Sequence, residues 1–152
     1  MLYFLIKWLH VMAAIAALGS NMTFGFWIVR ASREPGALSF TLRTIKFIDD
    51  RIANPSYGVL LLTGLAMVWV SDFPFHTPWL ELGMTLYFVT FVLGVFFYTP
   101  TLKRQIAALE RSGMDSPEYQ AAAARGRTLG MVLGIISITI VFLMVVKPTL
   151  WG

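Results

Sequence analysis

The sequence predicts an all-α protein, a four-transmembrane-helix bundle whose N and C termini both lie on the outer side of the membrane. Three observations lead to this prediction. The 152 residues are 57% hydrophobic and 13% charged, with a mean hydropathy of +0.71, a composition typical of membrane proteins. The charged residues leave four long uncharged runs between them, and the basic residues are concentrated in two of the connecting segments.

Each uncharged run is long enough to cross a membrane once. The runs cover residues 8–29, 52–71, 82–102 and 128–146 and contain 22, 20, 21 and 19 residues. A hydrocarbon core of about 30 Å needs about 20 helical residues, because each residue adds about 1.5 Å. Four runs of near-equal length argue against buried helices of a soluble protein, and none alternates as the strands of a β-barrel do. We therefore expect a single domain, 1–152, with spans at about 3–29, 52–71, 82–102 and 128–147.

The basic residues predict the orientation of the helices. Ten of the 12 Lys and Arg lie in two connecting segments: Arg30, Arg33, Arg43, Lys46 and Arg51 in the first, and Lys103, Arg104, Arg111, Arg125 and Arg127 in the second. The positive-inside rule places both segments in the cytoplasm. We expect a multi-pass protein of the bacterial inner (plasma) membrane. Its basic residues should contact headgroups of the lipid bilayer, so the pI of about 9.7 does not indicate nucleic-acid binding.

The first basic segment carries helix signals of its own. Three apolar residues are spaced as on one face of a short amphipathic helix at the membrane surface: Leu38, Leu42 and Ile45. The sequence DDRIANPS follows, and we expect a new helix there, with Asn54 as its N-cap and Pro55 at its first position. Residues 49–51 would then form a solvated boundary with local ion pairs.

The remaining connections predict which helices pack together. Only about ten residues join the second and third runs, so these helices should be antiparallel neighbours. The third helix can continue past the membrane to Arg111, with Gly113 as its C-terminal cap. The next helix can begin in the sequence DSPE, with Asp115 or Ser116 as N-cap and Pro117 in the first turn. The third and fourth helices should thus form a hairpin that extends beyond the bilayer.

Polar residues in the first helix indicate a candidate site. His10, Ala14, Ala17, Asn21 and Gly25 recur every three or four residues, so they share one face of the helix. Small side chains allow another helix or a flat ligand to approach closely. This face is therefore either a packing seam or one wall of a pocket.

His10 has several interpretations that the sequence leaves open. A neutral imidazole can hydrogen-bond to another helix, or one ring nitrogen can ligate a metal such as the iron of haem b, because ionisable residues inside a membrane tend to be functional. A proton relay is a third use. By the predicted topology, Met67, Met84, Met144 and, more weakly, His76 lie at the same depth and could supply a second ligand. Each methionine is also a typical core residue.

Other polar residues could complete a cofactor-binding set. Lys7 and Lys147 lie toward the outer side, where they can reach the lipid headgroups or pair with a haem propionate. Asn21 shares the face of His10. The chain has no cysteine, which excludes thiolate ligands, disulfides and c-type haem attachment. It also lacks hydrolase and phosphate-binding motifs, so we assign no catalytic residue.

The sequence resembles two related groups of bacterial membrane proteins. Over nearly the whole chain, including IKWLHV, DDRIANPSYGVLLLTGLAMVW and LMVVKP, it is similar to the integral-membrane family known as domain of unknown function 2269. The chain also resembles the HemJ type of protoporphyrinogen oxidase through its K-x-L-H start and its VVKP end. Proteins of that type are haem-associated membrane proteins of four helices. The second resemblance implies matching positions at Lys7, His10, Lys147 and Pro148.

The chain departs from the HemJ type in its histidines. That type has a further histidine near the cytoplasmic end of helix one, whereas the stretch WIVRASREPG has none. The resemblance therefore implies haem binding rather than protoporphyrinogen oxidation. We expect a b-type haem site with a redox or haem-related role. If the protein is an enzyme, we expect an oxidoreductase with a membrane redox partner. The alternatives are a cofactor-free interaction or assembly protein and a subunit of a small transporter, which would need a homo-oligomer to line a path.

Overall fold

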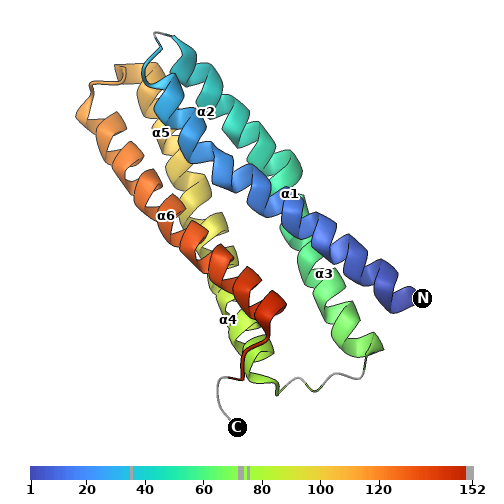
Figure 1. The fold of residues 1–152 in the computed structure, drawn as a ribbon. Coiled ribbons are helices and arrows are strands. Elements are labelled where there is room, and N and C mark those ends of the chain that lie inside the picture. The colour runs from blue at the N-terminus through green and yellow to red at the C-terminus, as the bar shows by residue number, and fades with distance from the viewer. Residues whose placement is uncertain (35, 72–73, 75, 150–152) are drawn as a thin grey trace.

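Helices make up most of the chain. The computed structural model describes residues 1–34, 36–71, 74 and 76–149. Its helices in chain order are α1 (Leu2–Ala31), α2 (Ala37–Ile48), the π-helix η1 (Asp49–Ala53), α3 (Asn54–Val70), α4 (Pro78–Val92), the π-helix η2 (Leu93–Tyr98), α5 (Thr99–Ser112) and α6 (Pro117–Val146). Because α2, η1 and α3 follow one another without a break, as do α4, η2 and α5, the chain forms four long helical rods (Figure 1).

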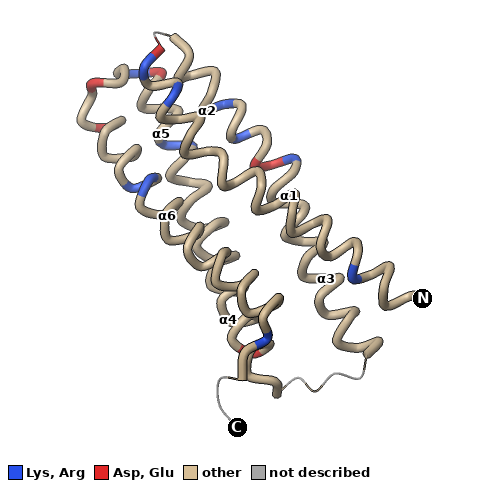
Figure 2. Tube along the Cα trace, viewed as in Figure 1, with Lys and Arg blue, Asp and Glu red and all other residues tan. Residues whose placement is uncertain are grey.

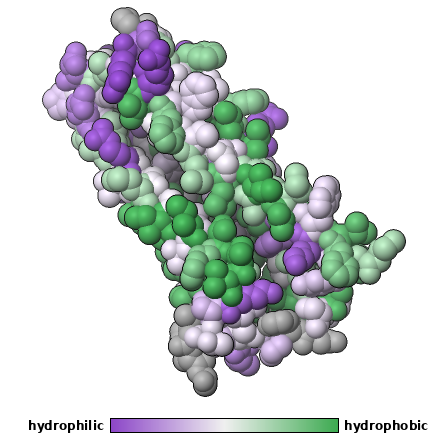
Figure 3. Space-filling view, viewed as in Figure 1, coloured by the Kyte–Doolittle hydropathy of each residue, from purple (hydrophilic) through white to green (hydrophobic). Residues whose placement is uncertain are grey.

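All four rods are long and apolar enough to cross a membrane: Leu2–Ala31, Ala37–Val70, Pro78–Ser112 and Pro117–Val146. The predicted all-α fold with four candidate transmembrane helices is confirmed. Large apolar side chains lie on the outside of these rods. Phe26, for example, is 77% exposed and Ile135 is 67% exposed. Such a surface is stable in hydrocarbon and not in water, and Figure 3 shows apolar residues spread over the middle of the molecule.

Charged residues and the buried core gather at one end of the bundle. Figure 2 shows most acidic and basic residues near the α1–α2 and α5–α6 connections and along α2 and α5. The main core cluster lies between these elements and consists of Phe24, Ala31, Leu38, Leu42, Ile45, Leu102, Ala108 and Tyr119. The three apolar residues predicted for one face of α2 are all in this cluster. We call this end of the molecule the charged end.

The predicted α5–α6 connection is confirmed in detail. Gly113 has a φ of 80°, and it caps α5 by donating its N–H to the carbonyl of Leu109. Ser116 is the N-cap of α6, and its hydroxyl oxygen accepts a hydrogen bond of 3.2 Å from the N–H of Tyr119. Pro117 begins the helix. The junction of α2 and α3 in the second rod was predicted less well.

Asn54 does not cap a new helix, so that prediction is wrong. Its φ and ψ of −61° and −46° are helical, and the chain runs from α2 through η1 into α3 as one rod. The N–H of Asn54 bonds to the carbonyl of Asp49, five residues earlier. A wider π-turn just before Pro55 accommodates a residue that lacks an N–H and would otherwise crowd the preceding turn.

The third rod also accommodates a proline through a π-turn. Pro100 lies in the first turn of α5, directly after η2, and the N–H of Thr99 bonds to the carbonyl of Gly94, again five residues back. In both rods a π-turn therefore precedes a proline in mid-helix. Proline normally ends or kinks a helix, but here each rod continues toward the charged end.

The prediction that the second and third helices are antiparallel neighbours is wrong for α3 and α4, although the two rods pack on each other through α2 and α5. Among the described residues α3 packs mainly on α1, and α4 packs mainly on α6, with no extensive contact between α3 and α4. Figure 1 shows these two pairs diverging away from the charged end. The residues that join Val70 to Pro78 number seven and can span up to about 24 Å when extended, so a short connection does not force the two helices together.

Candidate functional site

His10 lies at the contact between α1 and α3. Its Nδ1 is 2.9 Å from the hydroxyl oxygen of Thr63, which in turn donates to the carbonyl of Val59 at 2.6 Å. The same hydroxyl lies at a longer distance, 3.3 Å, from the carbonyl oxygen of Leu60. A threonine hydroxyl has only one proton, so with that proton on Val59 the oxygen accepts from His10. This assigns the imidazole proton to Nδ1 and leaves Nε2 with its lone pair.

A glycine lets the two helices approach each other at His10. A Cβ atom added to Gly64 would lie 3.4 Å from Cε1 and 3.8 Å from Nδ1 of the imidazole. A larger side chain at this position would push the ring and α1 away from α3. The ring is half-buried, and one side of it is therefore occupied by the backbone of α3.

Asn21 joins the same two helices about three turns further along α1. Its side-chain N–H donates to the hydroxyl oxygen of Tyr57 at 2.7 Å. The hydroxyl of Tyr87 on α4 donates to the backbone carbonyl of Tyr57 at 2.6 Å, and Ser137 on α6 lies near the Tyr57 side chain. Tyr57 thus links three of the four rods through hydrogen bonds, a role that its aromatic side chain in an apolar run did not reveal.

The small residues of the predicted face of α1 differ in how deeply they are buried. Ala17 is fully buried and Ala14 is half-buried, whereas Gly25 is exposed with no atom within 4 Å of an added Cβ. The part from His10 to Asn21 is therefore mainly a seam against α3. The part around Gly25 is open.

The predicted methionine ligands lie on different helix pairs. Met67 follows Thr63 by about one turn of α3 and is half-buried. Met84 belongs to α4 and Met144 to α6, the pair that diverges from α1 and α3 in Figure 1. Met144 packs on α4, since a Cβ added to Gly83 would lie 2.5 Å from its methyl carbon. The structure thus gives Met144 a packing role, and among the three candidate methionines it places Met67 on α3, the helix that carries the partner of His10.

The remaining predicted site residues lie at the surface. The side chain of His76 is 95% exposed and its Nδ1 is 3.1 Å from a carboxylate oxygen of Glu81. Lys7 is exposed one turn before His10. Lys147 ends α6 in the left-handed conformation, with a φ of 51°, and its Nζ lies 5.2 Å from the centre of the Trp79 ring. No group of three His, Asp or Glu that could hold a metal ion occurs among the residues that the structure describes.

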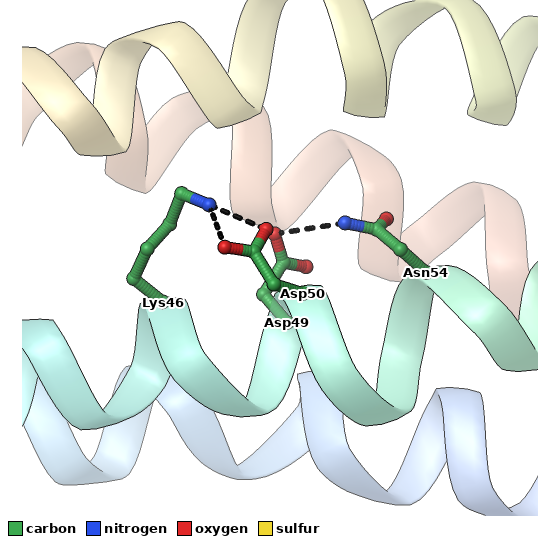
Figure 4. A network of polar contacts seen from close by, with 4 residues as sticks. All are labelled: Lys46, Asp49, Asp50 and Asn54. Carbon is green, nitrogen blue, oxygen red and sulfur yellow. Dashed lines mark hydrogen bonds and ion pairs between the residues drawn. The ribbon is translucent and has the colours of Figure 1, made fainter.

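Asp49 is a buried polar residue that the sequence did not reveal. It was expected at a solvated boundary, but it is only 5% exposed in η1, and the side-chain N–H of Asn54 donates to it at 3.4 Å. Asp50 pairs instead with Lys46. Figure 4 shows these side chains projecting from the second rod toward the neighbouring helices. Because the helix does not stop at Asn54, its continuous path carries Asp49 into the bundle.

The comparisons with known proteins agree with this architecture. The family of predicted integral membrane proteins DUF2269 matches residues 4–148, which is nearly the whole chain. Comparisons with curated proteins and with solved structures found no significant match, so the resemblance to the HemJ type gains no support from them. The chain is a multi-pass integral membrane protein that belongs to the DUF2269 family.

Proposed function

We propose that the protein binds one b-type haem through His10 and serves a haem-linked redox role in the bacterial inner membrane. The observation that carries this proposal is the distance of 2.9 Å between Nδ1 of His10 and the hydroxyl oxygen of Thr63. Because this hydroxyl donates to the carbonyl of Val59, we infer that Nδ1 of His10 carries the imidazole proton and that Nε2 keeps the lone pair that an iron ligand needs. A histidine that ligates a metal through one ring nitrogen usually donates a hydrogen bond from the other, and this bond fixes the orientation of the ring.

The donor chemistry of the chain is compatible with haem. Histidine is a common axial ligand, and methionine is a common second one; among the candidate methionines, Met67 shares α3 with the partner of His10. Lys7 is exposed one turn from His10. Lys147 follows the last residue of α6, which ends at the same end of the bundle at which α1 begins. Either lysine could pair with a propionate. When bound, haem would supply one-electron chemistry. The protein residues would hold the iron, orient the imidazole and exclude water. Asn21, by contrast, is already engaged with Tyr57.

The proposed orientation follows from the charges. Both basic connections would face the cytoplasm, and both termini would face the outer side. The charged end, with α2 and α5, would then project into the cytoplasm. His10 would lie in the outer half of the membrane, where a membrane redox partner could reach its cofactor.

A cofactor-free interaction or assembly protein is the second candidate. It is favoured by the close contact of His10 with Gly64 and by the hydrogen bonds that join α1, α3 and α4 through Tyr57. In this case His10 and Asn21 would serve only to hold the helices together. The two candidates differ in one property that is easily measured, the visible absorbance.

The test is a set of oxidised and dithionite-reduced spectra of protein purified in mild detergent from haem-replete cells. We expect a stoichiometric Soret band that His10→Ala abolishes and that the control His76→Ala retains, because His76 is exposed and paired with Glu81. Thr63→Val should retain the haem but shift its reduction potential, since it removes the partner of Nδ1.

Two results would overturn the haem proposal. One is a wild-type protein that stays colourless after haem titration. The other is a Soret band that survives in His10→Ala. If the protein is colourless and His10→Ala and Thr63→Val destabilise it to a similar extent, the second candidate is favoured, because the contact between His10 and Thr63 is then structural.

A further inference from the structure

A shallow groove, largely open to its surroundings, lies on the surface of α1 and the turn that follows it, close to the charged end and far along the helix from His10. Its volume is about 450 Å³, and its lining residues are Met22, Gly25, Phe26, Val29, Arg30 and Arg33. None of these residues belongs to the candidate haem site. The groove lies where α1 passes from its uncharged run into the first basic segment, which is the depth of the lipid headgroups.

The part of the groove within the uncharged run is apolar and open. No atom lies within 4 Å of a Cβ added to Gly25, so the missing side chain leaves a notch in the helix surface. Met22, Phe26 and Val29 surround this notch and are 57%, 77% and 56% exposed. A hydrocarbon chain could lie against these side chains in the notch, because apolar surface of this kind is covered in a membrane.

Two arginines close the other end of the groove. Arg30 forms an ion pair of 3.2 Å with Glu34, in which both side chains are more than half exposed; such a pair is weak and easily exchanged. Among the residues that the structure describes, Arg33 makes no ion pair. Guanidinium groups bind phosphate oxygens through two parallel hydrogen bonds. The groove therefore combines an apolar floor with an anion-binding end.

We propose that this groove binds an anionic phospholipid such as phosphatidylglycerol. Its phosphate would lie between Arg30 and Arg33, and one acyl chain would follow the notch at Gly25 toward Met22. Charge complementarity decides between lipids: two arginines are opposed here by one carboxylate, so a headgroup with a net negative charge is favoured over a zwitterionic one. The site is independent of the haem proposal, because it shares no residue with His10 and its surroundings.

The experiment compares lipid binding to the purified full chain by native mass spectrometry and by thermal unfolding in detergent. Dioleoyl phosphatidylglycerol is compared with dioleoyl phosphatidylcholine, dioleoyl phosphatidylethanolamine and soluble glycerol phosphate. We expect a preference of about tenfold for phosphatidylglycerol over phosphatidylcholine, since each arginine near a membrane surface contributes a severalfold effect. Phosphatidylglycerol, but not glycerol phosphate, should also raise the unfolding temperature.

Three variants locate the site. Arg30→Gln with Arg33→Gln should reduce the preference to less than about twofold, and Gly25→Leu should weaken lipid binding while leaving both charges in place. The matched control is Arg125→Gln with Arg127→Gln, a pair of exposed arginines on α6, which should retain the preference. All these side chains are at the surface, and native mass spectrometry counts only bound lipid on the folded protein.

Several results would overturn the proposal. Equal binding of all three lipids would exclude charge selection, and an equal loss in the control pair would indicate a diffuse attraction to basic residues. Full stabilisation by glycerol phosphate, or unchanged lipid binding in Gly25→Leu, would exclude an acyl chain in the notch. A loss of the preference confined to the Arg30 and Arg33 variant, together with weakened binding in Gly25→Leu, supports the site.

Discussion

The hydrogen bond between Asn21 and Tyr57 should contribute measurably to the stability of the fold. It joins α1 to α3 across 36 positions of sequence, with 2.7 Å between the amide nitrogen and the hydroxyl oxygen. Hydrogen bonds between membrane helices contribute about 0.6 kcal/mol on average and up to about 1.7 kcal/mol. Because this one is short and both side chains are half-buried, we expect about 1 kcal/mol, or about a fivefold change in the unfolding constant.

A double-mutant cycle isolates this contribution. Asn21→Leu and Tyr57→Phe each remove the same bond, so the double variant should be less destabilised than the sum of the single variants, by about 1 kcal/mol. The hydroxyl of Tyr87 donates to the backbone carbonyl of Tyr57, so Tyr57→Phe leaves that second bond intact. The free energy of unfolding is measured by titrating the protein in mixed micelles with a denaturing detergent.

A matched cycle controls for non-specific effects. Thr23 is exposed on the same helix and its hydroxyl bonds within α1, to the carbonyl of Ser20. Thr23→Val combined with Tyr57→Phe should therefore be additive. If the Asn21 and Tyr57 variants are also additive within about 0.3 kcal/mol, the bond contributes nothing to stability, and its assignment as a stabilising link between α1 and α3 is refuted.

Three further predictions, the first with a control variant, test local features of the fold. Gly64→Leu should destabilise the protein by about 1–3 kcal/mol through overpacking, whereas Gly58→Leu on the same helix, with open space around an added Cβ, should cost less than about 0.5 kcal/mol. Ser116→Ala removes the N-cap of α6 and should cost about 1 kcal/mol, seen as a lower unfolding temperature. Asp50→Asn breaks an ion pair with Lys46 at positions i and i+4 and should change the unfolding free energy by less than about 0.5 kcal/mol; a larger loss would mean that this pair supports the π-turn.

Local signals predicted the ends of helices where only local contacts decide them. Ser116 and Gly113 form their caps through atoms within four residues, so the sequence carried all the necessary information. The same type of signal failed at Asn54. A favourable N-cap residue and a proline were present there. The helix nevertheless continues, because the π-turn η1 accommodates the proline and packs on α1.

The candidate site was predicted in part. His10 and Asn21 were identified because polar residues are rare in an uncharged run, and both lie in a seam between α1 and α3, one of the two arrangements that their spacing allowed. Their partners were not identified. Thr63 is 53 positions from His10, and a threonine in an apolar helix usually bonds to its own backbone, as this one also does. Nothing local distinguishes it from the other threonines of the chain.

The sequence by itself determined the class of the protein, the number of its long helices and the place of its charges. These properties follow from composition, from run lengths and from contacts within a few residues. Only the tertiary structure decided that α3 pairs with α1 and not with α4, that Asp49 is buried, and that Tyr57 joins three of the rods through hydrogen bonds. Apolar helices offer one another similar surfaces in a membrane. Their pairing therefore depends on a few small residues and hydrogen bonds between distant positions, which become visible only when the helices are placed together.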